Sequence, residues 1–243
     1  MKKPFLIAGP CSAKSEKHIF EIAKNISPYI DVFRAGLWKA RTHPDSFAGV
    51  GELGLPWLQK INLELGLKTS TEIANTHHVE KCLYYNIDMF WIGARTVTNP
   101  FSIQEIAESL RGTQKTVIIK NPIHPDIKAW IGAIERIKKA NIKNIILVHR
   151  GFFSGNKNKY RNEPIWEIPL KIKKMFPEHI LLCDPSHISG DKKWVYEISK
   201  EALLKNKMDG LMIEVHVKPE LSLSDKKQHI NNFDLEKIYY DLF

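Results

Sequence analysis

Basic side chains gather in one short segment of the sequence, and their types and spacing suit the binding of anions. Residues 34–42 read Arg-Ala-Gly-Leu-Trp-Lys-Ala-Arg-Thr, so Arg34, Lys39 and Arg41 fall within eight residues, among small residues that permit close backbone approach. Guanidinium groups bind phosphate and carboxylate through paired hydrogen bonds, and an ammonium group acts as a compact point charge. A solvated basic loop is the alternative interpretation of this segment.

A second set of residues could hold a metal ion. The donors are one thiol, one imidazole and two carboxylates, on Cys11, His187, Glu214 and Asp225. Together they suit a divalent transition metal, with manganese, iron, cobalt and zinc all acceptable. Glu214 lies in the otherwise apolar stretch 211–216, where a buried carboxylate is unfavourable unless it is paired or bound to a metal.

Other histidines and an aspartate lie near these donors in the sequence. His216 follows Glu214 by two residues and either supports the metal ligands or is a hydrogen-bonded core histidine. Asp184 precedes His187 and either orients a group of the site or caps the following turn. The role of His149, just before Arg150, is left open by the sequence.

The elements that must position these residues alternate regularly along the chain. Short apolar runs predict strands at 5–9, 32–36, 68–72, 89–93, 116–120, 145–148, 180–184 and 210–215. Amphipathic patterns predict helices at 16–26, 56–65, 77–85, 103–110, 125–140, 164–176, 192–204 and 235–242. Strict alternation favours parallel strands buried on both faces. The count predicts a single-domain (β/α)8 TIM barrel over residues 1–243, since no Gly-x-Gly-x-x-Gly turn supports a doubly wound sheet.

The predicted strand ends carry an unusual ring of residues. In a β/α barrel the active site forms at the carboxyl ends of the strands. The residues at or just beyond those ends can all ionise or bind a metal: Cys11, Arg34, Glu72, Arg95, Lys120, Arg150, His187 and Glu214. With Lys39 and Arg41, six cations would surround one cavity and repel each other without anions. We therefore expect substrates with several negative charges, such as phosphate esters.

Composition limits the other classes of function. The net charge of +9 permits a nucleic-acid-binding protein, but the lysines are spread over helical segments and no zinc-finger or RNP-like motif is present. No run of eighteen apolar residues and no signal peptide are found, so we expect a cytoplasmic protein without a membrane or nucleic-acid partner. Three scattered cysteines do not form a disulfide framework.

Five motifs, in this order, resemble those of one enzyme family. They are Gly9-Pro10-Cys11-Ser12, residues 39–47 (Lys-Ala-Arg-Thr-His-Pro-Asp-Ser-Phe), Ile92-Gly93-Ala94-Arg95, Asp184-Pro185-Ser186-His187, and Ile213-Glu214-Val215-His216 followed by Leu223-Ser224-Asp225. They resemble the compact 3-deoxy-D-arabino-heptulosonate 7-phosphate (DAHP) synthases, close to the 3-deoxy-D-manno-octulosonate 8-phosphate (KDO8P) synthases. The resemblance runs from residue 5 to about 230 and implies the barrel already predicted. It also implies condensation of phosphoenolpyruvate with erythrose 4-phosphate, the first step of the shikimate pathway to chorismate and the aromatic amino acids.

The resemblance assigns roles to individual residues. It implies that Cys11, His187, Glu214 and Asp225 are the four ligands of one divalent metal ion. It implies that the phosphoenolpyruvate phosphate binds Arg95, Lys120, Arg150 and the Ala94 amide. Arg34 and Lys39 match positions near the carboxylate and reacting carbons of phosphoenolpyruvate, and Glu72 matches an acidic residue beside it. Arg41 and Thr42 match the site of the aldose phosphate. Lys39 is expected to be the proton donor or electrostatic stabiliser.

Some positions depart from the family pattern. Lys39-Ala40-Arg41-Thr42 replaces the common Lys-Pro-Arg-Thr, and the alanine resembles the Lys-Ala-Asn-Arg of KDO8P synthases. Because Arg41-Thr42 and the residues after them match DAHP synthases, we favour erythrose 4-phosphate over arabinose 5-phosphate. A catalytically idle scaffolding barrel is disfavoured by the intact ligand positions. The family also implies a homodimer or homotetramer, and a separate chorismate mutase or regulatory partner would have to supply feedback control, since no such domain is recognised here.

Overall fold

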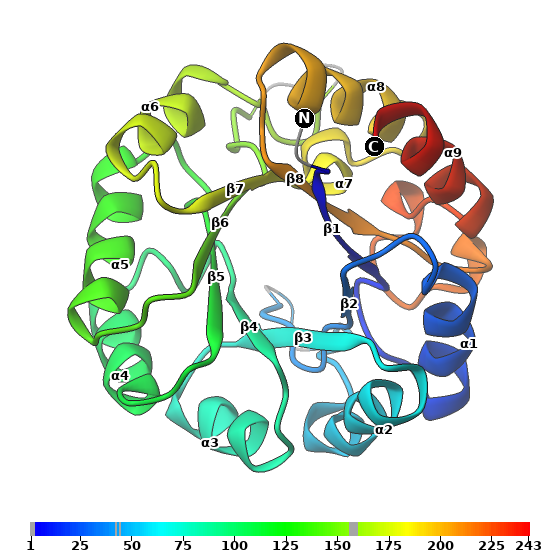
Figure 1. Cartoon of the computed structure of the whole chain (residues 1–243), viewed down its shortest axis with the longest axis horizontal. Helices are drawn as coiled ribbons and strands as arrows, with labels where there is room; N and C mark the ends of the chain where they lie inside the picture. Colours follow the sequence, from blue (N-terminus) through cyan, green and yellow to red (C-terminus); the bar gives the residue numbers. More distant parts are fainter. Residues whose placement is uncertain (1–2, 42, 44, 156–159) are drawn as a thin grey trace.

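Eight parallel strands close into a barrel that helices surround (Figure 1). The computed structural model describes residues 3–41, 43, 45–155 and 160–243. The strands are β1 (Phe5–Gly9), β2 (Val32–Arg34), β3 (Lys68–Ile73), β4 (Met89–Ile92), β5 (Thr116–Lys120), β6 (Ile145–His149), β7 (Ile180–Cys183) and β8 (Gly210–Glu214). Each strand pairs with the next in sequence, and β8 returns to β1 with Glu214 beside Gly9. The predicted (β/α)8 barrel is confirmed.

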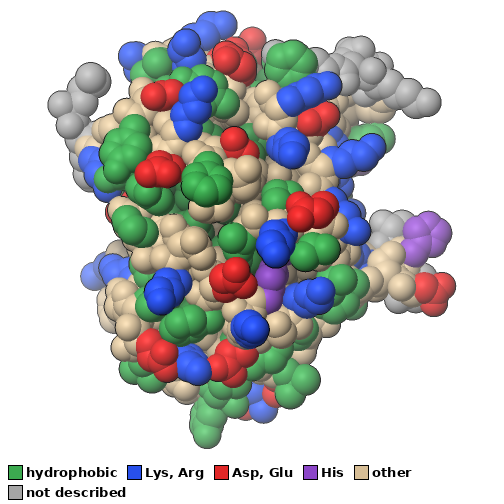
Figure 2. Space-filling view, turned by 90° about the vertical axis from the view of Figure 1, so that its right-hand side faces the viewer, with side chains coloured by type: hydrophobic (Ala, Val, Ile, Leu, Met, Phe, Trp, Pro, Cys, Tyr) green, Lys and Arg blue, Asp and Glu red, His purple; other side chains and the backbone are tan. Residues whose placement is uncertain are grey.

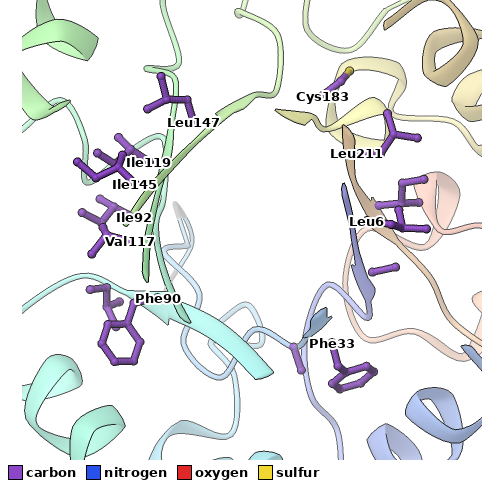
Figure 3. Packing of buried hydrophobic residues seen from close by; sticks show 14 of the residues in the cluster. Leu6, Phe33, Phe90, Ile92, Val117, Ile119, Ile145, Leu147, Cys183 and Leu211 are labelled. Atoms are coloured by element: carbon purple, nitrogen blue, oxygen red, sulfur yellow. The ribbon is translucent and has the colours of Figure 1, made fainter. Parts of the chain in front are cut away.

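Alternating side chains divide the apolar residues into two layers. The barrel interior contains Ile7, Val32, Met89, Trp91, Ile118, Ile146, Val148, Leu182 and Met212. The residues between them in sequence point outward against the helices, as Figure 3 shows for Phe90, Ile119 and Leu211. Because the side chains of a strand alternate, both faces of the sheet are buried, which explains the nearly continuous apolar runs.

The helices follow the predicted pattern closely over most of the chain. They are α1 (Glu16–Ile26), α2 (Leu55–Leu65), α3 (Thr76–Tyr84), α4 (Pro100–Leu110), α5 (Ile127–Lys139), α6 (Glu167–Met175) and α9 (Asn232–Leu242). Side-chain caps fix several starts: Ser15, Asn75, Asn99 and Asp126 each accept a hydrogen bond from a backbone amide of the first turn. Short 3-10 turns at η1 (Gly51–Gly54), η4 (Pro219–Leu221) and η5 (Lys226–Gln228) occupy the loops.

Two helical segments differ from the prediction. A short helix, α7 (Pro185–Ser189), follows β7 directly because Asp184 caps it, Pro185 starts it, and Gly190 ends it at φ +68°. The helix predicted at 192–204 is divided into a 3-10 turn η2 (Lys192–Trp194), α8 (Val195–Lys200) and a wider π turn η3 (Glu201–Lys205). Between β8 and α9 the chain forms a loop whose residue Asp225 lines the cavity at the strand ends.

The surface of the described chain has a mixed character. On the face that Figure 2 shows, basic side chains are interspersed with acidic and hydrophobic ones. None of the described helices combines the length and the hydropathy that crossing a membrane would require.

Candidate active site

A cavity of about 450 Å³ opens at the carboxyl ends of the strands. Seven cationic side chains line it among the described residues: Arg34, Lys39, Arg41, Arg95, Lys120, Arg150 and Arg161. Three carboxylates face the same space, those of Glu72, Glu214 and Asp225. Cys11, His187 and Ala94 are also in the wall. Every predicted site residue that the structure describes therefore lines one cavity, and Thr42 lies outside the described residues.

The strands determine how deeply the site residues at their ends are buried in the cavity. Arg34, Lys120 and Glu214 are the last residues of β2, β5 and β8, and all three are buried. Arg150 follows β6 by one residue and is also buried. Alternate residues of these strands point into the barrel. The last inward residue of each strand therefore places its charged group at the carboxyl end of the barrel, above the apolar interior.

The candidate metal donors lie close to one another. Cys11 Sγ is 3.2 Å from Asp225 Oδ2, and His187 Nε2 is 3.7 Å from Glu214 Oε1. The Lys39 ammonium donates to Cys11 Sγ and lies 3.1 Å from Asp225 Oδ2. Burial raises the pKa of the Cys11 thiol well above its ordinary value, with Glu214 and Asp225 adding to the effect. A protein cation thus contacts two of the candidate ligands, which also contact each other.

His187 is oriented by a buried carboxylate. Its Nδ1 atom is 2.8 Å from Asp184 Oδ2, and its backbone amide donates to Asp184 Oδ1 at 3.0 Å. Asp184 therefore both orients the imidazole and caps the turn, the two possibilities that the sequence left open. The same carboxylate accepts a 2.8 Å hydrogen bond from Lys120 Nζ. With Nδ1 held in this way, Nε2 faces the cavity, as is usual for histidines that bind metals.

Glu214 is held in its ionised form. Its Oε1 atom lies 3.2 Å from Arg34 Nη2, and its Oε2 atom accepts a 2.7 Å hydrogen bond from Gln228. Burial alone would raise the pKa of this carboxyl, but His187 and Arg34 outweigh burial and lower it to about 2. The Arg34 guanidinium also lies over the Trp91 ring, 4.7 Å from its centroid.

The donor chemistry of this cluster fits a divalent metal ion. Thiol, imidazole and carboxylates suit transition metals, and the imidazole has the carboxylate partner that commonly fixes such a ligand. As they stand, the described histidine, cysteine, aspartate and glutamate side chains include no group of three or more arranged to hold an ion. Two of these side chains, Cys11 and Asp225, instead contact the Lys39 ammonium.

Three guanidinium groups of the cavity have no carboxylate partner among the described residues. They belong to Arg41, Arg95 and Arg150, whereas Arg34, Lys39, Lys120 and Arg161 each pair with an acidic group. Arg150 donates to Asn162 Oδ1 at 2.9 Å, and burial lowers its pKa to about 10. A buried cation without an anionic partner is unfavourable, so the cavity beside the buried Arg150 is suited to an anion.

Glu72 is fitted closely against the strand beside it. A Cβ atom on Gly93 would lie 2.2 Å from Glu72 Oε1, so any larger residue there would displace the carboxylate from its present position. Burial raises the pKa of Glu72, and nearby Lys120 acts in the opposite direction. The carboxyl is thus held at the cavity wall between β3 and β4.

Several residues of the site were not found from the sequence. Arg161 donates to Asp225 Oδ1 at 2.8 Å and to Gln228 Oε1 at 2.7 Å, and His229 accepts from the Cys11 amide at 3.0 Å. All three lie in loops without periodic patterning. The only sequence feature that could have indicated them is their place in polar stretches, just after Asp225 and in the loop that follows Arg150.

The two histidines with open roles lie behind the cavity wall. His216 contacts His18, with 2.7 Å between their Nε2 atoms, and its Nδ1 accepts from the Lys218 amide. Its ring lies 5.9 Å from that of His229, so it supports the loop rather than the cavity. His149 is buried beside Phe152 and Trp166, and burial lowers its pKa to about 3.

A β/α barrel with these strand-end residues defines a class of enzyme that acts on anionic substrates at the barrel mouth. The chain belongs to the DAHP synthetase I family, which it matches over residues 2–241. This family match confirms the resemblance drawn from the five motifs.

Relatives carry the names of two related enzymes. The chain is 33% identical over 234 residues to a phospho-2-dehydro-3-deoxyheptonate aldolase of Thermotoga maritima, covering 96% of this chain and 66% of that protein. It is 30% identical over 267 residues to a 2-dehydro-3-deoxyphosphooctonate aldolase of Wolinella succinogenes, covering 98% and 97% of the two chains. A crystal structure of the Thermotoga maritima DAHP synthase superimposes with a TM-score of 0.88 at 29% identity, covering 98% of this chain and 68% of that one. The chain thus spans about two thirds of the length of the Thermotoga maritima protein.

Proposed function

We propose that this chain is a DAHP synthase, a transferase that condenses phosphoenolpyruvate with erythrose 4-phosphate to give DAHP and phosphate. The observation that carries the proposal is that Arg41, Arg95 and Arg150 have no carboxylate partner among the described residues, in a cavity that also gathers a thiol, an imidazole and carboxylates. Two phosphorylated substrates would supply the missing negative charge. The family match supports this reaction.

One wall of the cavity suits the phosphate of phosphoenolpyruvate. In this proposal Arg95 and Arg150 bind phosphate oxygens, together with Lys120 and the Ala94 amide. Arg150 is already held in position without substrate. Asn121 Oδ1 accepts a hydrogen bond from its backbone amide at 2.6 Å, and Asn162 Oδ1 accepts one from its guanidinium. A guanidinium held in place before the substrate arrives loses little freedom on binding.

The deeper cations suit the carboxylate end of the same substrate. Arg34 is fixed by Glu214 and the Trp91 ring, and Lys39 lies nearer the mouth. Burial lowers the pKa of Lys39, but the surrounding Cys11, Glu214 and Asp225 outweigh it and raise the pKa above its ordinary value. Lys39 therefore stays protonated and is our candidate to give a proton to the aldehyde oxygen or to stabilise charge there.

The second phosphate is assigned to the loop after β2. Arg41 donates from Nε to the Phe47 carbonyl at 2.8 Å, which directs its guanidinium along the cavity wall. By the family resemblance Thr42, outside the described residues, would share this phosphate with Arg41. The two substrates would then lie with their phosphates on opposite sides of Lys39 and their reacting carbons between them.

We propose that Cys11, His187, Glu214 and Asp225 hold one divalent ion: manganese, iron, cobalt or zinc. When bound, the ion would act as a Lewis acid on the aldehyde of the acceptor. The side chains that line the cavity would align C3 of phosphoenolpyruvate with the aldehyde carbon, so that a carbon–carbon bond forms. Water adds at C2, and phosphate leaves with cleavage of its bond to carbon.

A second candidate acceptor is arabinose 5-phosphate, the substrate of KDO8P synthases. Ala40, which lines the cavity, is the residue that resembles that group, and the Wolinella succinogenes relative has the matching name at nearly full coverage. Arg41 supports erythrose 4-phosphate, because it is present here where the KDO8P synthase pattern has asparagine. We also propose, on the family resemblance, that the barrel is one catalytic domain that forms a homodimer or homotetramer, and that a separate chorismate mutase or regulatory partner would supply feedback control.

Oxygen labelling tests the reaction class. Phosphoenolpyruvate carrying ¹⁸O in the bridge between C2 and phosphorus should transfer the label to inorganic phosphate, because the proposed reaction breaks the carbon–oxygen bond. Phosphate should be released only when an aldose phosphate is present. Recovery of the label in the organic product would contradict the proposal, since it would indicate attack at phosphorus.

A further inference from the structure

A turn after β8 contains one of the four proposed metal ligands and contacts two others. The turn is formed by residues 225–229 and contains η5. Asp225 is its first residue, and the side chains of Gln228 and His229 point back toward β8 and β1, where both are buried. These contacts join loops that are more than 200 residues apart in sequence, since Cys11 and His229 differ by 218 positions.

The imidazole of His229 bridges Cys11 and Asp225. Its Nε2 atom lies 3.0 Å from the Cys11 amide nitrogen, and its Nδ1 atom lies 3.1 Å from the Asp225 carbonyl oxygen. A backbone amide can only donate, so Nε2 must be the acceptor and Nδ1 must carry the proton. A carbonyl can only accept, which requires the same tautomer. One neutral tautomer therefore satisfies both contacts.

The bridge stabilises an uncommon backbone conformation. Asp225 has φ +51°, in the left-handed region that few residues other than glycine, asparagine and aspartate adopt. Its carbonyl accepts from both the Gln228 amide, at 3.1 Å, and His229. In this conformation the Asp225 carboxylate reaches to 3.2 Å from Cys11 Sγ.

Gln228 makes the corresponding contact with the third ligand. Its Nε2 atom donates to Glu214 Oε2 at 2.7 Å, while its Oε1 atom accepts from Arg161 at 2.7 Å. The backbone of the turn is tied to β8 as well, because the Ile230 amide donates to the Glu214 carbonyl at 3.1 Å. The backbone at the end of the turn is therefore bonded to β8. The side chains of Gln228 and His229 bond to Glu214 and to the backbone of Cys11.

We propose that His229 is a positioning residue that sets the spacing between Cys11 and Asp225 for the metal ion, with Gln228 fixing Glu214 in the same way. This inference rests on the proposed metal site. His229 is not among the residues that line the cavity, and it contacts the backbone of two proposed ligands. Partners of this kind typically contribute 10- to 100-fold to metal affinity, so removal of His229 should weaken binding by about that factor.

Cobalt binding gives a readout other than activity. Co²⁺ bound to a thiolate has a charge-transfer absorption band, so titration of the metal-free full chain with Co²⁺ reports both affinity and the Cys11 contact. We expect His229→Ala to weaken Co²⁺ binding about 10- to 100-fold and to reduce the band. Equal affinity and an equal band in the wild type and in His229→Ala would overturn the inference and leave the metal site intact.

Two conservative variants separate the halves of the bridge. In His229→Gln an amide oxygen can stand near the Nε2 position and accept from Cys11, whereas in His229→Asn an amide NH₂ can stand near Nδ1 and donate to Asp225. We expect both to bind Co²⁺ better than His229→Ala, with the thiolate band better preserved in the glutamine variant. Affinities for both no better than that of His229→Ala would overturn the assigned tautomer and its bridge.

His179→Ala is the matched control. His179 is also buried but lies just before β7, at the opposite end of the barrel, stacked on Phe176. The variant His179→Ala should lower the melting temperature without changing the Co²⁺ affinity. This result would separate a general loss of stability from a positioning role. A Co²⁺ affinity lowered equally in His179→Ala would overturn the inference. Absence of the thiolate band in the wild type would overturn the proposed metal site and the inference together.

Discussion

The ammonium group of Lys39 donates a hydrogen bond to the thiol of Cys11 and lies 3.1 Å from Asp225 Oδ2. A protein cation thus contacts two of the proposed metal ligands. Because a divalent ion bound by the proposed ligands would need the same sulfur and oxygen atoms, Lys39 would compete with it for them. We therefore predict that metal binding would move the ammonium away, toward the space where the substrates are proposed to lie.

Replacing Lys39 by methionine should separate metal binding from catalysis. The variant Lys39→Met keeps most of the side-chain volume but removes the competing charge. We expect Mn²⁺ to bind about tenfold more tightly, since a charge a few ångströms from the ion opposes its binding by more than 1 kcal/mol even after solvent screening. Turnover should fall at least about 100-fold. Calorimetry and a phosphate-release assay measure the two effects, and weaker Mn²⁺ binding would rule out the competition.

Metal affinity should increase as the pH rises. Burial raises the pKa of the Cys11 thiol, so the metal-free protein holds the proton that a bound metal would displace. A group with a raised pKa stays protonated through neutral pH, so binding should release about one proton and tighten about tenfold per pH unit. Calorimetry in two buffers with different ionisation enthalpies measures this proton.

Cys11→Ala supplies the control for that measurement. The variant should lose both the proton release and at least about 100-fold in turnover while the barrel stays folded. Cys82→Ala, at a buried position on α3, should keep both, with only a modest loss of stability. Proton release that persists in Cys11→Ala would assign the titrating group elsewhere.

Arg150 should act mainly on the binding of phosphoenolpyruvate. Hydrogen bonds to charged groups are worth about 1.5–3 kcal/mol, so Arg150→Gln should raise KM for phosphoenolpyruvate about 10- to 100-fold. The KM for the aldose should change much less, because the other phosphate is assigned to Arg41. Arg111→Gln, on the exposed end of α4 beside Glu108, should leave both constants unchanged. An equal rise in both KM values would contradict the assignment.

Gly93 and Gly132 should respond oppositely to alanine. A Cβ atom at Gly93 would lie 2.2 Å from Glu72 Oε1, so Gly93→Ala must displace this carboxylate, and activity should fall about tenfold or more. Gly132 is inside α5, and a Cβ there meets only the flexible end of Arg136 at 3.0 Å. Gly132→Ala should raise the free energy of unfolding by about 0.5–1 kcal/mol with activity unchanged. Full activity in Gly93→Ala would show that Glu72 has no fixed role.

The fold was largely predictable because each strand is buried on both faces. β1 and β5 were predicted to the residue, since apolar runs flanked by helical patterns leave few alternatives. The short α7 was missed because capping by Asp184, not periodicity, creates it. The segment 192–204 was predicted as one helix because its apolar spacing does not reveal a change to wider turns.

The site was predictable where residues lie at strand ends and not where loops fold back. Arg34, Lys120 and Glu214 were found because barrel geometry fixes the position of a strand end. His229 and Arg161 were not, because their contacts depend on how the loops after β8 and β6 cross the mouth. A hydrogen bond between positions 11 and 229 leaves no pattern in a single sequence.

The choice of acceptor tests the central claim most directly. The purified chain, loaded with a divalent ion, should be assayed for phosphate release from phosphoenolpyruvate with erythrose 4-phosphate and with arabinose 5-phosphate. We predict that kcat/KM is at least about tenfold higher for erythrose 4-phosphate and that chelation abolishes turnover. Turnover with arabinose 5-phosphate alone would contradict the account and identify the chain as a KDO8P synthase.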